Sequence, residues 1–120
     1  MSDLSPRSTV LRFIGYVNAG DLEGIASLIA EDVKFTDIQG DVYWERGFMA
    51  NYLSEFPNYK IHVHHALQGG NGVAIIGKTS GSHVAPEIEE KEILVWTAEI
   101  RAGLISEWRI YADDGFAGRS

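Results

Sequence analysis

An aspartate stands at the end of an apolar strand pattern. In the stretch EDVKFTDIQG, residues 31–40, a period of two puts Val33, Phe35 and Asp37 on one face of a predicted strand. A carboxylate beside such side chains loses hydration, which would raise its affinity for a proton toward the working pH. A general base needs this property to remove a proton next to a carbonyl group. The alternatives are a solvated carboxylate, or one that caps the turn at residues 37–40.

The histidines are the next candidates for chemistry. His83, in the segment GSH, could orient a substrate carbonyl or pair with a carboxylate, and its simpler role is a hydrogen bond at a strand end. His62 and His64 fall on one face of a predicted strand, and His65 falls on the other. Two histidines at that spacing need a third ligand to hold zinc, and none is evident at a suitable spacing. We therefore predict no metal and no cofactor, and the role of these three histidines stays open.

Aromatic and aliphatic side chains could line a pocket for a small apolar molecule. Trp96 and Trp108 lie on the last two predicted strands and could face each other, and Ile110 shares a side with Trp108. Plain core packing is the alternative for each aromatic residue. The predicted ligand-binding residues are Phe13, Val17, Tyr52, Phe56, Trp96, Trp108 and Ile110.

The composition limits the class of protein. The 120 residues are 45% hydrophobic and 22% charged, which is typical of one globular domain. The net charge of −7 disfavours nucleic acid and anionic membranes as partners. No cysteine is present, so thiolate catalysis and disulfides are excluded. No apolar run is long enough to span a membrane and the first residues are polar, so we expect a soluble cytoplasmic protein.

Helices are predicted in the first half of the chain and strands in the second. Ser5 and Pro6 suit a helix start, and residues 18–20 suit its end. A second helix starts at Asp21, with Leu22, Ile25, Leu28 and Ile29 on its apolar face. The remaining predicted elements are a strand at residues 33–38, a helix from about residue 47 that ends before Pro57, strands at residues 59–68, 73–84, 91–100 and 104–114, a solvated acidic loop at residues 86–92 and a frayed tail at residues 114–120.

This order predicts an α+β domain. Helices that precede a run of antiparallel strands pack together on one side of the sheet. A strongly bent sheet wrapped around three N-terminal helices would form a cone with a pocket inside. That pocket is where the candidate residues would meet.

Parts of the sequence resemble a known family. The block RFIGYVNAGDLEGIASLIAEDVKFTDIQG, residues 12–40, resembles the N-terminal half of ketosteroid isomerases, with their GD-x-EG helix start and DD-x-x-x-x-D-P-x-G strand. TSGSHV and GLISEWRIYADD look like the GTH strand and the ending of SnoaL-like polyketide cyclases. These proteins share the cone-shaped fold of nuclear transport factor 2. The resemblance implies a single domain over residues 1–120, a small apolar ligand, a homodimer, and Asp37 at the position of the general base.

Other positions depart from the family pattern. By our alignment, the two oxyanion donors of the isomerases correspond to Phe13, which cannot donate, and Trp96, whose indole N–H can. Tyr16, three residues after Phe13, could replace the lost hydroxyl. Ile110 stands where cyclases and epoxide hydrolases keep an aspartate, and Asp113 is retained from the family ending. The Arg–Asp pair of the epoxide hydrolases aligns with Lys78 and Ser80, so steroid isomerisation and epoxide hydrolysis are not expected.

Three hypotheses follow. The first is an enzyme of the isomerase or cyclase type that transfers a proton on an apolar carbonyl compound, with Asp37, His83 and Tyr16 as candidate catalytic residues. The second is a binding module for a hydrophobic ligand. The third is a dimeric interaction domain, which can coexist with either of the others.

Overall fold

The computed structural model of the protein describes residues 5–112. Asp113 and the predicted frayed tail at residues 114–120 lie outside the described residues. In chain order the elements are α1 (Pro6–Ala19), α2 (Leu22–Ser27), β1 (Ile29–Thr36), β2 (Val42–Tyr43), α3 (Phe48–Glu55), β3 (Lys60–Gly69), β4 (Gly72–Ser80), α4 (Pro86–Lys91), β5 (Leu94–Arg101) and β6 (Leu104–Ala112).

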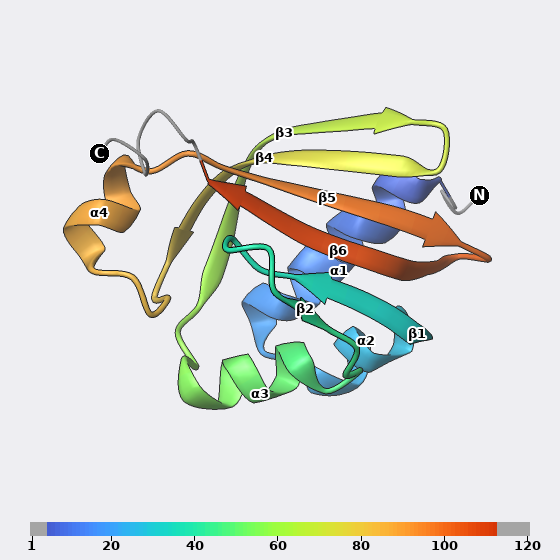
Figure 1. The fold of residues 1–120 in the computed structure, drawn as a ribbon, viewed down its shortest axis with the longest axis horizontal. Coiled ribbons are helices and arrows are strands. Elements are labelled where there is room, and N and C mark those ends of the chain that lie inside the picture. The colour runs from blue at the N-terminus through green and yellow to red at the C-terminus, as the bar shows by residue number, and fades with distance from the viewer. Residues whose placement is uncertain (1–4, 113–120) are drawn as a thin grey trace.

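One sheet carries all the strands, in the order β2-β1-β6-β5-β4-β3. Helix α1 runs along one face of this sheet, and α2 and α3 lie beside it below β1 and β2 (Figure 1). This arrangement confirms the predicted α+β class with three N-terminal helices. The sheet is mixed rather than wholly antiparallel, because β1 and β6 run parallel while the other neighbouring pairs are antiparallel. No hairpin joins β1 to β6, since they come from opposite halves of the chain.

The first helix begins and ends as predicted. The Ser5 side chain accepts a hydrogen bond from the backbone N–H of Ser8, and Pro6 takes the first helical position. Gly20 ends α1 in the left-handed conformation, at φ 69°. Asn18 then fastens the end of α1 to the edge strand β3, because its amide donates to the Ile61 carbonyl at 2.9 Å and accepts from the Ile61 N–H at 2.7 Å.

The second helix is shorter than predicted. Asp21 caps α2 by accepting from the Gly24 N–H, as expected, but the helix ends at Ser27. Ile29 lies in β1 opposite Ile105, and the Leu28 carbonyl accepts from the Ile105 N–H at 2.8 Å. Pairing with β6 therefore converts the expected last helical residues into the start of a strand. Strand β1 ends at Thr36 and not at residue 38, because Asp37 begins the turn to β2.

The acidic stretch at residues 86–92 is largely exposed, as expected, but it is not a loop, and Glu89 and Glu92 in it are buried. It forms α4, which has Pro86 at its first position, acidic residues in its first turn and Lys91 in its last. The strands on either side are correspondingly shorter than expected. Strand β4 ends at Ser80, because Gly81 turns the chain at φ 71°, and β5 starts only at Leu94.

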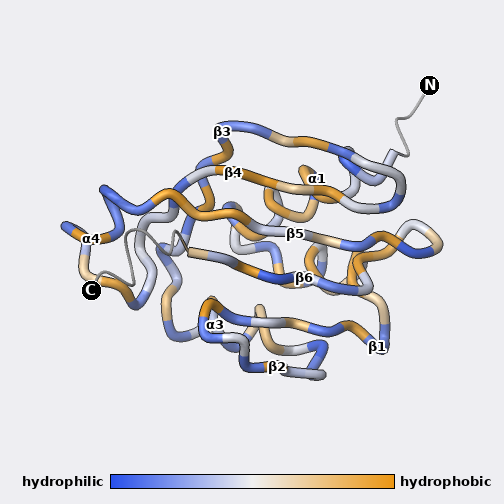
Figure 2. The backbone as a smooth tube through the Cα atoms, turned by 45° about the horizontal axis from the view of Figure 1, so that its top comes forward, coloured by the Kyte–Doolittle hydropathy of each residue, from blue (hydrophilic) through white to orange (hydrophobic). Residues whose placement is uncertain are grey.

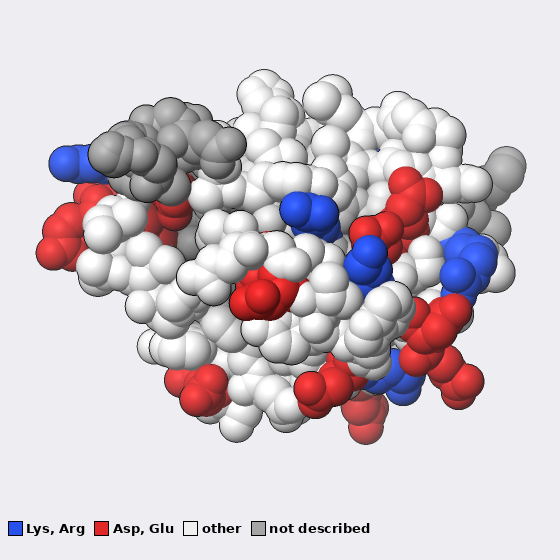
Figure 3. All heavy atoms as spheres, in the orientation of Figure 1, with Lys and Arg blue, Asp and Glu red and all other residues white. Residues whose placement is uncertain are grey.

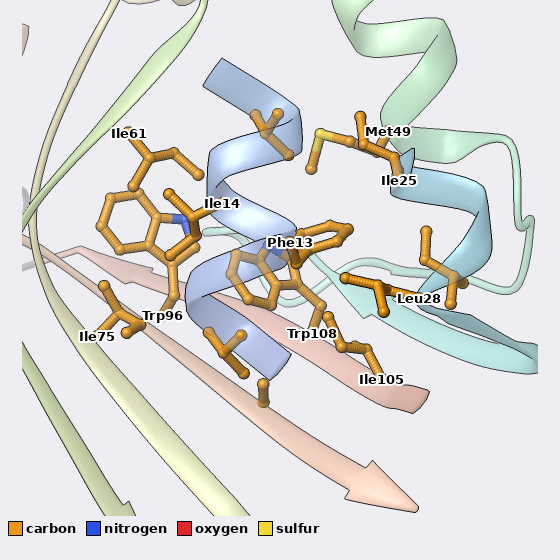
Figure 4. Close-up of a cluster of buried hydrophobic side chains, with 14 of the residues drawn as sticks. Phe13, Ile14, Ile25, Leu28, Met49, Ile61, Ile75, Trp96, Ile105 and Trp108 are labelled. Atoms are coloured by element: carbon orange, nitrogen blue, oxygen red, sulfur yellow. The ribbon is translucent and has the colours of Figure 1, made fainter. Parts of the chain in front are cut away.

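The hydrophobic core lies between the sheet and the N-terminal helices. Strand β4 is largely hydrophobic, whereas the hairpin connections are hydrophilic (Figure 2). Figure 4 shows Trp96 beside Ile14, Ile61 and Ile75, and Phe13 beside Trp108. Along β5 the buried residues alternate with more exposed ones, so one face of the strand packs on α1.

Candidate functional site

A pocket of about 360 Å³ opens between α3, the end of β1, the β4–α4 connection and the inner face of β5 and β6. Its wall is mostly apolar, with a few polar side chains placed among aromatic rings, which is the usual character of a small-molecule site. Its lining residues are Asp37, Ile38, Gln39, Phe48, Met49, Tyr52, Tyr59, His83, Val84, Glu92, Trp96, Trp108 and Ile110.

Asp37 lines this pocket and also caps a turn. Its Oδ1 atom accepts from the backbone N–H groups of Gln39 at 3.0 Å and Asp41 at 2.9 Å, and its Oδ2 atom accepts from the Tyr43 hydroxyl at 3.2 Å. The hydrogen bond and the negative charge of Asp37 raise the pKa of Tyr43. Asp37 therefore lines the pocket and also organises the turn between β1 and β2, as the capping interpretation predicted.

His83 and Tyr52 form a second polar group at the pocket wall. The Tyr52 oxygen lies 2.8 Å from His83 Nδ1, and it accepts from the His83 backbone N–H at 3.2 Å. The hydroxyl donates to Nδ1 or accepts from it, according to which ring nitrogen of His83 carries the proton. Burial raises the pKa of Tyr52, which keeps the hydroxyl protonated. His83 thus pairs with a phenol and not with the carboxylate that the sequence suggested.

Trp96, Trp108 and Ile110 line the pocket from the sheet. Trp96 lies directly opposite Ile110 in the β5–β6 pairing, so both side chains point to the same face. Trp96 is 1% exposed, and its indole makes a hydrogen bond with Tyr59. Because the indole nitrogen can only donate, the Tyr59 oxygen is the acceptor, and the Tyr59 proton stays available to another group.

Four of the predicted site residues do not line the pocket. Phe13 and Val17 are buried in the core, and the Phe13 ring packs edge-on against Trp108 at 4.9 Å between ring centroids. Tyr16 faces α2, where its ring lies so close to Gly24 that a Cβ atom there would be 2.5 Å from it. Phe56 packs behind the pocket on Tyr52, with ring centroids 4.9 Å apart. Tyr16 is therefore not placed to replace a hydroxyl at Phe13, because the helix turns it to another neighbour.

Glu92 and Tyr59 are the ionisable lining residues that sequence reasoning missed. Glu92 follows α4 directly and is only 8% exposed. Tyr59 directly precedes β3 and is also buried. A signal for Glu92 was present: the inward alternation of Leu94 and Trp96 continues one step back to residue 92. Interpreting residues 86–92 as one solvated stretch concealed it.

Two acidic side chains near α4 sit in opposite electrostatic environments. Burial acts to raise the pKa of Glu89, but hydrogen bonds from the hydroxyls of Ser82 and Thr79 and from backbone N–H groups outweigh it and lower that pKa. Glu92 lacks such donors. Burial, and then repulsion from Glu89, raise the pKa of Glu92. Glu89 is thus held as a carboxylate, while Glu92 is biased toward its neutral form.

Replacing Glu92 with glutamine is expected to stabilise the fold at about pH 8 but not at about pH 4. An ordinary glutamate is ionised at the higher pH and largely protonated at the lower one. In the folded protein the raised pKa makes ionisation of Glu92 unfavourable relative to the unfolded chain. The stabilising contribution of neutral Glu92 is complete below the unfolded pKa and is lost as the pH rises through the folded pKa. Glutamine cannot ionise, so the variant avoids that loss.

Urea unfolding at both pH values measures this difference in the free energy of unfolding. Glu90→Gln serves as the matched control, because Glu90 is an exposed residue of α4. This variant should change stability little at either pH. An equal effect of Glu92→Gln at both pH values would contradict the assigned burial.

A second, more open cleft lies outside the main pocket. His62 and His64 line it together with Lys78 and Ser80, and His62 Nε2 lies 2.8 Å from the Ser80 hydroxyl. The predicted alternation of faces along residues 62–65 is interrupted by a register shift between Val63 and His65. Lys78 and Ser80 thus line this cleft and not the main pocket. The positions aligned with the Arg–Asp pair of the epoxide hydrolases therefore do not face the candidate site. Among residues 5–112, no cluster of three or more His, Cys, Asp or Glu side chains is arranged to hold a metal ion.

The described helices are too short or too polar to cross a lipid bilayer.

Comparison with known proteins places the chain in a family. The SnoaL-like domain model matches residues 10–115. No match was found among curated proteins. An NTF2-like protein of unknown function from Cytophaga hutchinsonii superposes with a TM-score of 0.75 at 17% identity, covering 95% of each chain. A candidate ketosteroid isomerase from Kribbella flavida superposes with a TM-score of 0.73 at 20% identity, over 90% of this chain and 77% of the other.

A candidate polyketide cyclase from Sinorhizobium meliloti is similarly related, with a TM-score of 0.71 at 16% identity over 86% of this chain and 93% of the other. At these identities the structural likeness shows the fold and not the activity. The fold is that of the NTF2-like proteins, and the chain belongs to the SnoaL-like domain family.

Proposed function

We propose that this protein binds a small apolar carbonyl compound and transfers a proton on it, as an isomerase or cyclase does. The observation that carries the proposal is the main pocket itself: Asp37 stands at its wall among apolar and aromatic side chains. The family includes isomerases and cyclases, which supports this class of reaction.

The chemistry needs a base and a donor for the developing charge. In the proposed reaction Asp37 accepts a proton from the carbon next to the carbonyl, and the electron pair moves to the carbonyl oxygen as an enolate forms. The same proton, or one from solvent, then returns to a carbon of the product. A hydrogen-bond donor at the wall stabilises the enolate oxygen, and a ring N–H of His83 and the Tyr59 hydroxyl are among the candidates.

A binding module without turnover is the second candidate. Its supporting observation is the environment of Asp37, whose two oxygens already accept from Gln39, Asp41 and Tyr43. A carboxylate occupied in this way is a structural anchor first, and catalysis needs one of its remaining lone pairs to reach the ligand.

Titration with α-tetralone and with its hydrocarbon counterpart tetralin tests both candidates. Chemical-shift changes at Tyr52, Trp96 and Trp108 report binding, and loss of the proton signals next to the carbonyl in deuterium oxide reports proton transfer. Binding with accelerated exchange supports the enzyme, and binding without exchange supports the module. Failure to bind either compound in the pocket would remove both.

We further propose that the protein forms a homodimer through the outer face of its sheet. Strand pairing places Ile76, Val95 and Tyr111 in one row on the face opposite to Trp96, and Tyr111 is exposed. The area over β3 and β4 is largely uncharged on the face seen in Figure 3, which makes it suitable for burial against a second copy.

Tyr111→Lys is expected to weaken this dimer at least about tenfold, because a charged ammonium would have to lose water in the interface. Sedimentation velocity over a range of protein concentrations measures the change. Leu22→Lys, at a similarly exposed apolar position on α2, is the matched control and should leave the association unchanged. A wild-type protein that sediments as a monomer at all concentrations would refute the proposal.

A further inference from the structure

We infer that Glu92 is the group that binds the carbonyl oxygen of the ligand, by donating a hydrogen bond from its neutral carboxyl group into the pocket. The inference rests on the proposed function, since it concerns the same pocket, and it narrows the ligand to an uncharged molecule that carries an acceptor oxygen. The residue lies on a segment that the sequence pattern assigned to solvent.

The first observation is that the Glu92 side chain is buried and has no partner. More than nine-tenths of its surface is covered, and it lines the main pocket together with Trp96 and Ile110. Among residues 5–112, no hydrogen bond or ion pair involves its carboxyl group. Its carboxyl oxygens are not among the fully buried side-chain atoms that lack a partner, so they reach the open space of the pocket, where a ligand atom can bond to them.

The second observation is that the neighbouring carboxylate has a fixed role. Glu89, three residues earlier and 6% exposed, accepts from the Thr79 hydroxyl at 2.9 Å and from the Ser82 N–H at 3.1 Å. These bonds hold Glu89 in its ionised form and attach α4 to the end of β4. The negative charge of Glu89 opposes a second charge on Glu92, which favours the neutral form of Glu92.

Together these features define the ligand chemistry. A neutral carboxyl group donates through its O–H, so the complementary ligand atom is an acceptor such as a ketone, enone or quinone oxygen. An anionic ligand would meet the charges of Glu89 and Asp37 and the net charge of −7 of the whole chain. Pure hydrocarbons would fit the apolar wall but would leave Glu92 without a partner.

Other titratable groups line the same pocket, and their contributions to ligand binding must be distinguished from that of Glu92. Asp37 lies at the end of β1, Tyr52 on α3, Tyr59 before β3 and His83 in the β4–α4 connection, and all of them line the pocket. Only a change at residue 92 itself distinguishes the contribution of Glu92 from theirs. The test therefore compares two substitutions at this position.

The experiment compares α-tetralone with tetralin in the wild type, Glu92→Gln and Glu92→Leu. Glutamine keeps a donor but cannot ionise, and leucine removes the donor while filling a similar volume. Dissociation constants come from tryptophan fluorescence, from about pH 4 to about pH 9, a range that extends well above the ordinary titration of glutamate. Infrared spectroscopy records the carbonyl stretch of the bound ketone, which a donated hydrogen bond lowers in frequency.

We expect the wild type to prefer the ketone by about tenfold at low pH and to lose this preference as the pH rises. Glu92→Gln should keep the preference at every pH, and Glu92→Leu should bind both compounds alike, with the carbonyl stretch of an unbonded ketone. A preference that survives in Glu92→Leu, with the frequency unchanged from wild type, would overturn the inference while leaving the proposed function intact. Failure of the wild type to bind either compound would overturn both.

Discussion

Replacing Asp37 with asparagine is expected to lower the rate of proton exchange on a bound ketone by about a hundredfold to ten-thousandfold, the range usual for loss of a general base. The fold should survive, because the amide oxygen of asparagine can still accept from the backbone N–H groups of Gln39 and Asp41. Exchange of the protons next to the carbonyl of α-tetralone in deuterium oxide, followed by proton NMR, measures the effect. Binding of the ketone should change much less than the rate.

Asp41→Asn is the matched control for this substitution. Asp41 is an exposed carboxylate at the other end of the same turn, and it does not line the pocket. The control should preserve the exchange rate, so that a loss at Asp37 cannot be attributed to a change in net charge. If Asp37→Asn exchanges the ketone as fast as the wild type does, Asp37 is a turn residue and the base must be sought elsewhere in the pocket.

Replacing Trp96 with alanine is expected to lower the free energy of unfolding by about 3–5 kcal/mol, the cost typical of truncating a large buried aromatic residue. Trp96 is the largest fully buried side chain of the described residues, and it packs between α1 and the sheet. Its loss also removes the hydrogen bond to Tyr59, which would leave the buried hydroxyl without that donor. Urea unfolding followed by far-ultraviolet circular dichroism measures the change.

Trp44→Ala provides the comparison, because Trp44 is the same residue type at 65% exposure. Its removal should alter stability by no more than about 0.5 kcal/mol, as is usual for surface positions. Similar losses for the two variants would mean that Trp96 does not occupy the core as described. A large loss at Trp96 alone would establish that the wall of the pocket is also part of the core, so pocket variants at this position must be checked for folding first.

Asp37 combines two structural features that act differently on catalysis, because it lines the pocket and also caps the turn between β1 and β2. A carboxylate held by a turn is well positioned, and positioning favours catalysis, but its hydrogen bonds compete with the substrate proton. Glu92 differs in this respect, because its carboxyl group has no partner in the described structure and is free to interact with a ligand. The pocket thus contains one carboxyl group held by hydrogen bonds, Asp37, and one without a hydrogen-bond partner among residues 5–112, Glu92.

Local patterns in the sequence determined most of the fold. The Ser5–Pro6 start and Gly20 end of α1 follow from capping chemistry, and the inward row of Val33 and Phe35 follows from the period of two. The same periodicity predicts that Trp108 and Ile110 share one side of the last strand, and both line the pocket. These features depend on neighbours within a few residues, so the amino-acid sequence contains enough information to predict them.

The tertiary structure decided the rest, because those features depend on contacts between distant segments. Ile29 is in a strand because β6 pairs with it, and residues 86–91 form a helix that buries Glu89 because Thr79 and Ser82 supply hydrogen bonds to that residue. Likewise, only packing reveals that Tyr16 turns to α2 while Glu92 turns to the pocket. The charge of a residue predicts its preference for water, but a local pattern cannot show when burial against other elements overrides that preference.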